Sequence, residues 1–387
     1  MPAAVRQRVV FNGRFLAQVH TGVQRYAAET LLALDALLAA RPELSALWQF
    51  ELAVPDAARP LPLSCIRRVH VSGRGGHLWE QWPLLRHSHQ AFLVNFNYSG
   101  PLLKRRQLIT IHDATVRAMP QAFSRAYRWV HNAMVSVLGR SAASVMTVSE
   151  FSRRELRRWF GLRRADILVG REGGEHAVRP ADDAAVLRQH GLESGRFILG
   201  VGSVKPNKNF DLVGRAIRLR PGYPWPVAIA GAKDIGIFRD TSVRADGFRF
   251  LGFVSDEDLA ALYRHAAWFV LPSLYEGFGL PAIEAMANGC PVLAARAASI
   301  PEVCGDAALY FDPLDPASLA DVLQRVAQQP ELRDRYVAAG RERLARYHWR
   351  ANAEILLAHL AQKLLAQPDR PEAALHSPTH AGCHHDR

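Results

Sequence analysis

Residues 273–289 place a glycine-rich loop between a buried strand and a helix. The apolar run at 267–272 before the loop is typical of a central strand in a parallel sheet. Pro281 suits the first turn of a helix, where a missing N–H costs no hydrogen bond. Because the free N–H groups of a helix start attract anions, this stretch predicts a strand–loop–helix unit that binds one.

Two carboxylates, Glu276 and Glu284, bracket this loop, with seven residues between them. Gly277 and Gly279 let a ligand approach the backbone closely. A loop that offers amides to an anion and also carries acids suits a ligand with both phosphate and hydroxyl groups, such as a nucleotide sugar. The spacing alone favours an ordinary glycine-rich loop that carries two solvated acids.

The residues around these acids are more specific than their spacing. Glu-Gly-Phe-Gly-Leu-Pro at 276–281 and Glu-Ala-Met-Ala-Asn-Gly at 284–289 resemble the retaining GT-B glycosyltransferases of family four, the group 1 type. That family carries a Glu-x7-Glu motif in the same setting. The resemblance covers about residues 8–365 and extends to bacterial mannosyltransferases of surface-polysaccharide assembly. It implies an α/β protein with the GT-B fold, in which two Rossmann-like, doubly wound domains face each other across a cleft.

Short apolar segments alternate with helical patterns along both halves of the chain, as two doubly wound sheets require. Strands are expected at 8–11, 50–54, 91–96, 108–111, 145–148 and 167–169, and then at 197–202, 227–230, 249–251, 268–271, 292–294 and 308–311. We expect an N-terminal Rossmann-like acceptor domain at 1–178 and a C-terminal nucleotide-sugar donor domain at 179–347. A terminal helix at 348–366 should cross back to the first domain, followed by a disordered tail at 367–387.

In the N-terminal half, His112 follows the apolar segment 108–111. The carboxyl ends of strands are where open α/β sheets bind ligands. The resemblance implies that His112 contacts the transferred sugar, although a single histidine is often structural or solvated. Gly22 precedes a helical pattern at 24–38, and the resemblance implies a loop near the phosphates and the acceptor. A plain turn before a helix explains Gly22 equally well.

In the C-terminal half, Lys205 and Lys208 follow a predicted strand and can hold a diphosphate between them. The family has a basic segment here that ends in Lys-Asn, matched by Lys208 and Asn209. Many relatives carry an arginine before that lysine, where this chain has Asn207. The role of Lys205 is therefore less directly supported than that of Lys208.

The resemblance assigns a role to each candidate residue. Glu276 would hold hydroxyls of the donor sugar, His112 would position the sugar and the attacking hydroxyl, and Lys208 would stabilise the departing diphosphate. Substrate-binding positions are Gly22, Lys205, Asn209, Val254, Gly277, Phe278, Gly279, Leu280 and Glu284, with Glu284 on the ribose. No cofactor and no metal are expected, because lysines and a helix start can neutralise the phosphates. The Asp256-x-Asp258 pair is interpreted as a helix start capped by Ser255, not as a metal site.

The basic excess of the chain lies in its N-terminal half. The whole chain has a formal net charge of +12, and residues 1–180 contain 25 Lys and Arg but 12 Asp and Glu. This asymmetry indicates an anionic partner, although an arginine-rich composition explains part of it. An anionic membrane surface could meet the four arginines of 151–160 and the run at 102–106. No nucleic-acid-binding module is recognisable.

The resemblance implies a retaining hexosyltransferase in surface-polysaccharide biosynthesis. Its partners would be a nucleotide sugar, with GDP-mannose as the favoured donor, and a glycan or lipid-linked glycan acceptor. A GT-B nucleotide-sugar epimerase and a catalytically silent sugar-nucleotide-binding subunit remain as alternatives. No apolar run is long enough to span a membrane. A cytoplasmic enzyme is expected, and we extend this expectation to peripheral contact with the inner face of the plasma membrane.

Overall fold

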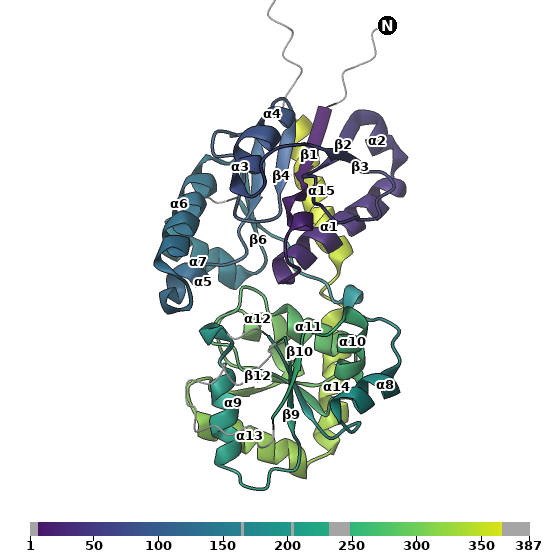
Figure 1. Ribbon diagram of the computed structural model, residues 1–387, viewed down its shortest axis with the longest axis vertical. Helices are drawn as coiled ribbons and strands as arrows, with labels where there is room; N and C mark the ends of the chain where they lie inside the picture. The colour runs from purple at the N-terminus through teal and green to yellow at the C-terminus, as the bar shows by residue number, and fades with distance from the viewer. Residues whose placement is uncertain (1–6, 164–165, 203–204, 232–247, 366–387) are drawn as a thin grey trace, which may run out of the picture.

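The computed structural model describes residues 7–163, 166–202, 205–231 and 248–365. It contains two parallel β-sheets, each with helices packed on both faces, and the two units lie one above the other in Figure 1. The expected pair of doubly wound sheets is therefore confirmed. The tail predicted at 367–387 lies outside the described residues.

The N-terminal sheet has seven strands in the order β3-β2-β1-β4-β5-β6-β7, and neighbouring strands in it pair in parallel. Its strands are β1 Gln7–Asn12, β2 Trp48–Val54, β3 Arg67–His70, β4 Phe92–Asn95, β5 Gln107–Thr110, β6 Ser144–Thr147 and β7 Ile167–Val169. Strand β3 was not predicted. It is an edge strand with a charged sequence and partly exposed residues, so it lacks the apolar signal of a central strand.

The C-terminal sheet has six parallel strands in the order β10-β9-β8-β11-β12-β13. Its strands are β8 Ile198–Val201, β9 Val227–Ala230, β10 Phe248–Gly252, β11 Trp268–Leu271, β12 Val292–Ala295 and β13 Ala308–Phe311. The central strands β9, β11 and β12 are buried along their whole length, which explains their unbroken apolar sequences.

Helices connect successive strands and cover both sheets. They are α1 Gly22–Ala39, α2 Pro42–Leu47, α3 His77–Trp79, α4 Leu85–His87, α5 Thr115–Ala118, α6 Arg125–Ser141, α7 Glu150–Phe160, α8 Asp183–His190, α9 Phe210–Arg218, α10 Asp256–His265, α11 Leu280–Ala287, α12 Ile300–Cys304, α13 Pro316–Gln328, α14 Glu331–Leu344 and α15 Trp349–Leu365. Single turns of 3-10 helix lie at η1 Gly13–Ala17, η3 Pro120–Ala122, η4 Glu175–Ala177, η5 Pro206–Lys208 and η7 Gly305–Ala307, and η2 Glu80–Leu84 is a π-helical turn.

The last helix, α15, leaves the C-terminal half and packs on α1 of the N-terminal half, as its yellow ribbon among purple elements shows (Figure 1). The Asn352 amide donates to the Thr30 hydroxyl over 2.8 Å, and the Gln7 amide donates to the Leu364 carbonyl over 3.3 Å. The chain therefore crosses between the halves twice, through residues 170–182 and again before α15.

The carboxyl ends of the two sheets meet where the halves touch. The segments after β5 and β6 in the N-terminal sheet contact the loop after β11 in the C-terminal sheet. Strand ends of this kind are where doubly wound sheets bind ligands. The fold therefore brings two binding edges together at one place.

Candidate active site

The loop that follows β11 carries an ion pair. Lys208 Nζ donates to Glu276 Oε1 over 2.7 Å, and the Ser273 hydroxyl donates to the same oxygen over 2.6 Å. The Lys208 and Glu276 side chains are only 19% and 13% exposed, so water screens this pair less than it would a surface pair. Two predicted site residues that lie 68 positions apart in sequence are thus in direct contact.

The carbonyl groups of residues 276–278 accept hydrogen bonds from serine hydroxyls. The Ser299 hydroxyl donates to the carbonyls of Glu276 and Phe278 over 2.9 Å each. The hydroxyls of Ser149 and Ser152 donate to the Gly277 carbonyl over 2.6 and 2.9 Å. Within the described chain, the backbone N–H groups of residues 277–279 donate no hydrogen bond. These amides precede α11, so they are donors available to an anion.

The two glycines of the loop serve different purposes. A Cβ on Gly277 would lie 2.9 Å from the Asp113 Cβ and 3.0 Å from the His112 carbonyl oxygen. The close approach predicted at this glycine is therefore made by the N-terminal half of the protein. Gly279 has a φ of 103°, which L side chains rarely adopt, and it sets the turn into α11.

Phe278 and Leu280 place their side chains in the core, at 3% and 7% exposure. The Phe278 ring packs edge-on against Tyr347 with centroids 5.5 Å apart. At these two predicted positions it is the backbone that faces a ligand, because the side chains anchor the loop from behind.

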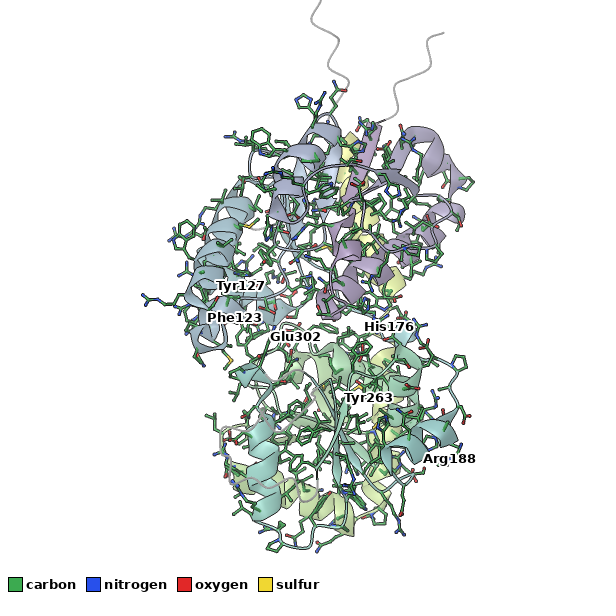
Figure 2. All side chains as sticks on the ribbon, in the orientation of Figure 1. Phe123, Tyr127, His176, Arg188, Tyr263 and Glu302 are labelled. Carbon is green, nitrogen blue, oxygen red and sulfur yellow. The ribbon has the colours of Figure 1, made fainter. Side chains whose placement is uncertain are left out.

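Glu284 is held by two hydrogen-bond partners. Its Oε1 lies 3.0 Å from His176 Nε2, and its Oε2 accepts from the Tyr263 hydroxyl over 3.1 Å. Burial, followed by the negative charge of Glu284, raises the pKa of Tyr263 well above its usual value, so this hydroxyl keeps its proton. His176 lies on η4 in the connection between the halves, at their boundary in Figure 2. Sequence reasoning missed His176 and Tyr263, since neither belongs to a recognisable motif.

A third acid, Glu172, was also missed. It lies in the connecting segment 170–182 and is 6% exposed. Burial, and next the negative charges of Glu284, Glu276 and Asp113, raise its pKa well above the ordinary carboxyl value. Glu172 is thus a buried carboxyl group whose protonated form is favoured by burial and by the negative charges of the two motif acids.

His112 occupies the carboxyl end of β5, as predicted from the sequence. Its Nε2 lies 3.0 Å from the Phe96 carbonyl oxygen, which can only accept, so Nε2 carries the proton and Nδ1 is the free acceptor. Its ring meets the Tyr26 ring edge-on, with centroids 4.8 Å apart. Burial lowers the pKa of His112, against opposing effects of the Phe96 carbonyl and Asp113. His112 is therefore a neutral, fixed imidazole.

The remaining predicted residues are more dispersed. Asn209 has a φ of 55°, and its amide donates to the carbonyls of Pro272 and Pro313, so this side chain ties the lysine segment to the loop after β11. Lys205 is exposed, with its Nζ 5.7 Å from the centre of the Phe123 ring. Val254 follows β10 and is half-buried. Gly22 begins α1, and a Cβ there would meet open space.

Several contacts fasten the two halves around the loop. The Glu302 carboxylate accepts from the backbone N–H groups of Glu150 and Phe151, over 2.8 Å each, at the start of α7. Arg25 on α1 pairs with Asp256 on α10 over 2.5 Å. Asp256 was interpreted only as a helix-start acid, and the structure adds this partner in the other half. The predicted cap itself is confirmed, because the Asp258 N–H donates to the Ser255 hydroxyl.

A small pocket opens at the carboxyl ends of β1 and β4 in the N-terminal half. Its lining includes Arg14, Gln18, Glu80 and Asn97. Glu80 is 1% exposed in its side chain and pairs with Arg14 over 3.0 Å. Its pKa is lowered by hydrogen bonds and by the Arg14 charge, which outweigh the opposite effect of burial. The pocket therefore offers fixed charges of both signs.

Among the described residues, no group of three or more His, Cys, Asp or Glu is arranged to hold a metal ion.

Comparisons with known proteins fit this geometry. The family described as "Glycosyl transferases group 1" matches residues 183–343. The O-antigen chain mannosyltransferase B of Escherichia coli is 31% identical over 294 residues, which cover 70% of this chain and 77% of that protein. The serotype-specific mannosyltransferase WbdA of Escherichia coli is 30% identical over 42% of this chain, but that match spans only 21% of WbdA.

Among solved structures, sucrose-phosphate synthase from Thermosynechococcus elongatus superposes with a TM-score of 0.70 at 20% identity, over 93% of this chain and all of that one. Fold and site thus define a GT-B glycosyltransferase. The chain belongs to the group 1 glycosyl transferases. None of the helices described here is both long and apolar enough to cross a membrane.

Proposed function

We propose that this enzyme transfers a hexose from a nucleotide sugar to a glycan or a lipid-linked glycan, with retention of the anomeric configuration. Mannose from GDP-mannose is the proposed donor. Two relatives that match this chain are named mannosyltransferases, one of them for the O-antigen chain. We also propose that the enzyme works in the cytoplasm, at the inner face of the plasma membrane, during surface-polysaccharide assembly.

The observation that carries this proposal is the Lys208–Glu276 pair beside the amides of residues 277–279. Cleavage of the bond between the anomeric carbon and the phosphate oxygen leaves positive charge on the sugar and sends negative charge to the diphosphate. Donors and cations placed in advance around the phosphate stabilise that negative charge. Lys208 and the loop amides would serve the diphosphate, while Glu276 would accept from sugar hydroxyls.

The N-terminal half would supply the acceptor. The attacking hydroxyl forms the new bond to the anomeric carbon, and its proton passes to the departing phosphate oxygen. His112 is neutral and has a fixed ring, so its part would be to position the sugar and not to act as an obligatory base. The pocket lined by Arg14, Gln18 and Asn97 is the proposed place for part of the acceptor.

A thermal-shift screen of nucleotide sugars, followed by product analysis, tests this function. A ligand at 100 times its dissociation constant stabilises a protein by about 2.7 kcal/mol, so the true donor should stand out. We expect GDP-mannose to give the largest shift, and proton NMR of the product to show the anomeric configuration of the donor. Conversion of the donor to an epimeric nucleotide sugar without acceptor would favour an epimerase, and binding without turnover would favour a silent subunit.

A further inference from the structure

Helix α6 exposes an apolar face to solvent. Its inner residues His131, Met134, Val135 and Leu138 pack against the N-terminal sheet. Its opposite face repeats at helical spacing and consists of Ala126, Trp129, Val130, Ala133 and Val137, which we call the outer face of α6. The Trp129 side chain is 75% exposed. A surface helix normally carries polar residues on this side, so this face is built to meet another surface.

Arginines lie at the two ends of the outer face of α6. Arg125 begins the helix, and Arg140 ends the face, where its guanidinium donates to the Ser136 and Phe160 carbonyls. Arg125 has no ion-pair partner among the residues that the structure describes. Residues 81–149 contain eight Lys and Arg but a single acid, Asp113, which belongs to the site. The partner of this face must therefore combine an apolar interior with negative charge at its boundary.

Further exposed apolar side chains lie in segments of the N-terminal half that are hydrogen-bonded, one to the next, to the end of α6. Leu103 is 80% and Trp82 is 70% exposed. The Ala143 N–H, just after α6, donates to the Arg105 carbonyl, and the Leu102 N–H donates to the Gln81 side chain. These bonds connect the end of α6, the loop 101–105 and η2 in sequence. Helix α6 forms the outer edge of the N-terminal half in Figure 1.

The basic segments singled out from the sequence suit an anionic surface less well. Lys104 is 5% exposed, its Nζ donates to the Ser88 carbonyl, and burial lowers its pKa to about 8. On α7, Arg153 pairs with Glu150, and Arg158 lies 3.6 Å from Glu155. Lys104, Arg153 and Arg158 thus already have partners within the chain.

We propose that the outer face of α6 lies in the interface of an anionic lipid bilayer, with Trp129 and Val137 among the headgroups. A helix in the plane of a membrane buries an apolar stripe and places arginines at anionic headgroups. Tryptophan is enriched at that depth because its ring is apolar and its N–H is polar. This inference rests on the proposed function, because the membrane contact would hold the enzyme beside a lipid-linked acceptor.

The test is co-sedimentation of the full chain with vesicles of phosphatidylcholine, with or without phosphatidylglycerol. We expect the parent to pellet with the anionic vesicles at low salt and to be released as salt shortens the Debye length. The double variant Trp129→Ser/Val137→Ser should bind at least tenfold more weakly. Leu314→Ser, at a residue that is 75% exposed in the C-terminal half, is the matched control and should bind like the parent.

Transfer to a water-soluble acceptor separates this inference from the proposed function. The double variant should retain the parent's rate there, since both residues are exposed and neither contacts a residue of the candidate active site. A parent that transfers sugar but binds neither vesicle type, or a double variant that binds like the parent, would overturn the inference. If sedimentation velocity shows a dimer that the double variant loses, while vesicles are ignored, the face is assigned to a second copy of the chain instead.

Discussion

The two halves of the site contribute different kinds of interaction. The C-terminal half brings a charge pair, Lys208 with Glu276, and free amides at the start of α11. The N-terminal half brings a neutral His112, fixed by the Phe96 carbonyl and the Tyr26 ring. In the proposed function, the first arrangement would stabilise charge that develops on the leaving group, and the second would position the sugar. We therefore propose that charge stabilisation and positioning are divided between the two halves.

The contacts between the halves follow from this division. Gly277 has no room for a Cβ because His112 and Asp113 lie against it, and its carbonyl accepts from Ser149 and Ser152. The loop that faces the anion is therefore partly shaped by the half that positions the sugar. Variants that remove a charge and variants that disturb only the positioning of the sugar should therefore differ in their effects on turnover and on nucleotide binding.

Lys208→Ala should lower turnover by about a hundredfold or more, the scale for losing one pre-placed electrostatic donor. The variant also leaves Glu276, only 13% exposed, without its cation. Steady-state kinetics with the identified donor measures the effect. Lys205→Ala in the same segment is the matched control, with a smaller loss expected because this side chain is exposed. Turnover of Lys208→Ala within about threefold of the parent would remove Lys208 from the site.

The two acids should separate in their effects. Glu276→Gln should mainly slow sugar transfer, since Glu276 faces Lys208 in the loop. Glu284→Gln should mainly weaken binding of the bare nucleoside diphosphate, by about tenfold, since it also disturbs the hydrogen bonds to His176 and Tyr263. Calorimetry with that nucleotide decides between them. Loss of affinity in the first variant with full affinity in the second would reverse the assignment.

His112→Ala should reduce activity by about tenfold without abolishing it, because the phosphate can accept the proton in retaining transfer. The lowered pKa keeps His112 neutral above pH 6.5, so the pH profiles of parent and variant should run parallel from pH 6.5 to 8. Complete loss of transfer with intact donor binding would contradict a positioning role. Profiles that diverge in this range would show that His112 titrates there.

Glu172→Gln should have the smallest effect on turnover and a clear effect on the pH dependence of stability. A carboxyl with a raised folded pKa binds a proton that the unfolded chain has released, so the parent loses stability as pH rises above about 4.5. The loss is about 1.4 kcal/mol per pH unit until the folded pKa is reached. Chemical unfolding at pH 5 and 7 should show that the free energy of unfolding of Glu172→Gln rises relative to that of the parent as the pH increases. A constant difference between the two pH values would mean that Glu172 is not protonated in the folded protein.

The C-terminal half of the site could be predicted largely from sequence because its residues are close together in the chain. The loop at 276–281, Pro281 and the lysine segment each follow a strand, and the structure joins Lys208 to Glu276. Glu172, His176 and Tyr263 could not be predicted from the sequence. Their contributions depend on burial and on interactions with Glu284, which lies on another element and, for His176, 108 positions away. The raised pKa of Glu172 is one signal that only a structure supplies.

In the N-terminal half, the central strands were predictable and the edges were not. Strands such as β5 and β6 have short apolar sequences that indicate burial. Edge strand β3 is charged and partly exposed, so it lacks the periodicity that identifies a strand. The outer face of α6 was not predicted, because the exposure of Trp129 is seen only in the structure.

Calorimetric binding of the nucleoside diphosphate to Lys208→Ala and His112→Ala tests the division of labour most directly. If charge stabilisation belongs to the C-terminal half, Lys208→Ala should lose at least tenfold in affinity. His112→Ala should then bind within about twofold of the parent, since its part concerns the sugar and the acceptor. Equal losses in the two variants, or a loss confined to His112→Ala, would contradict the account.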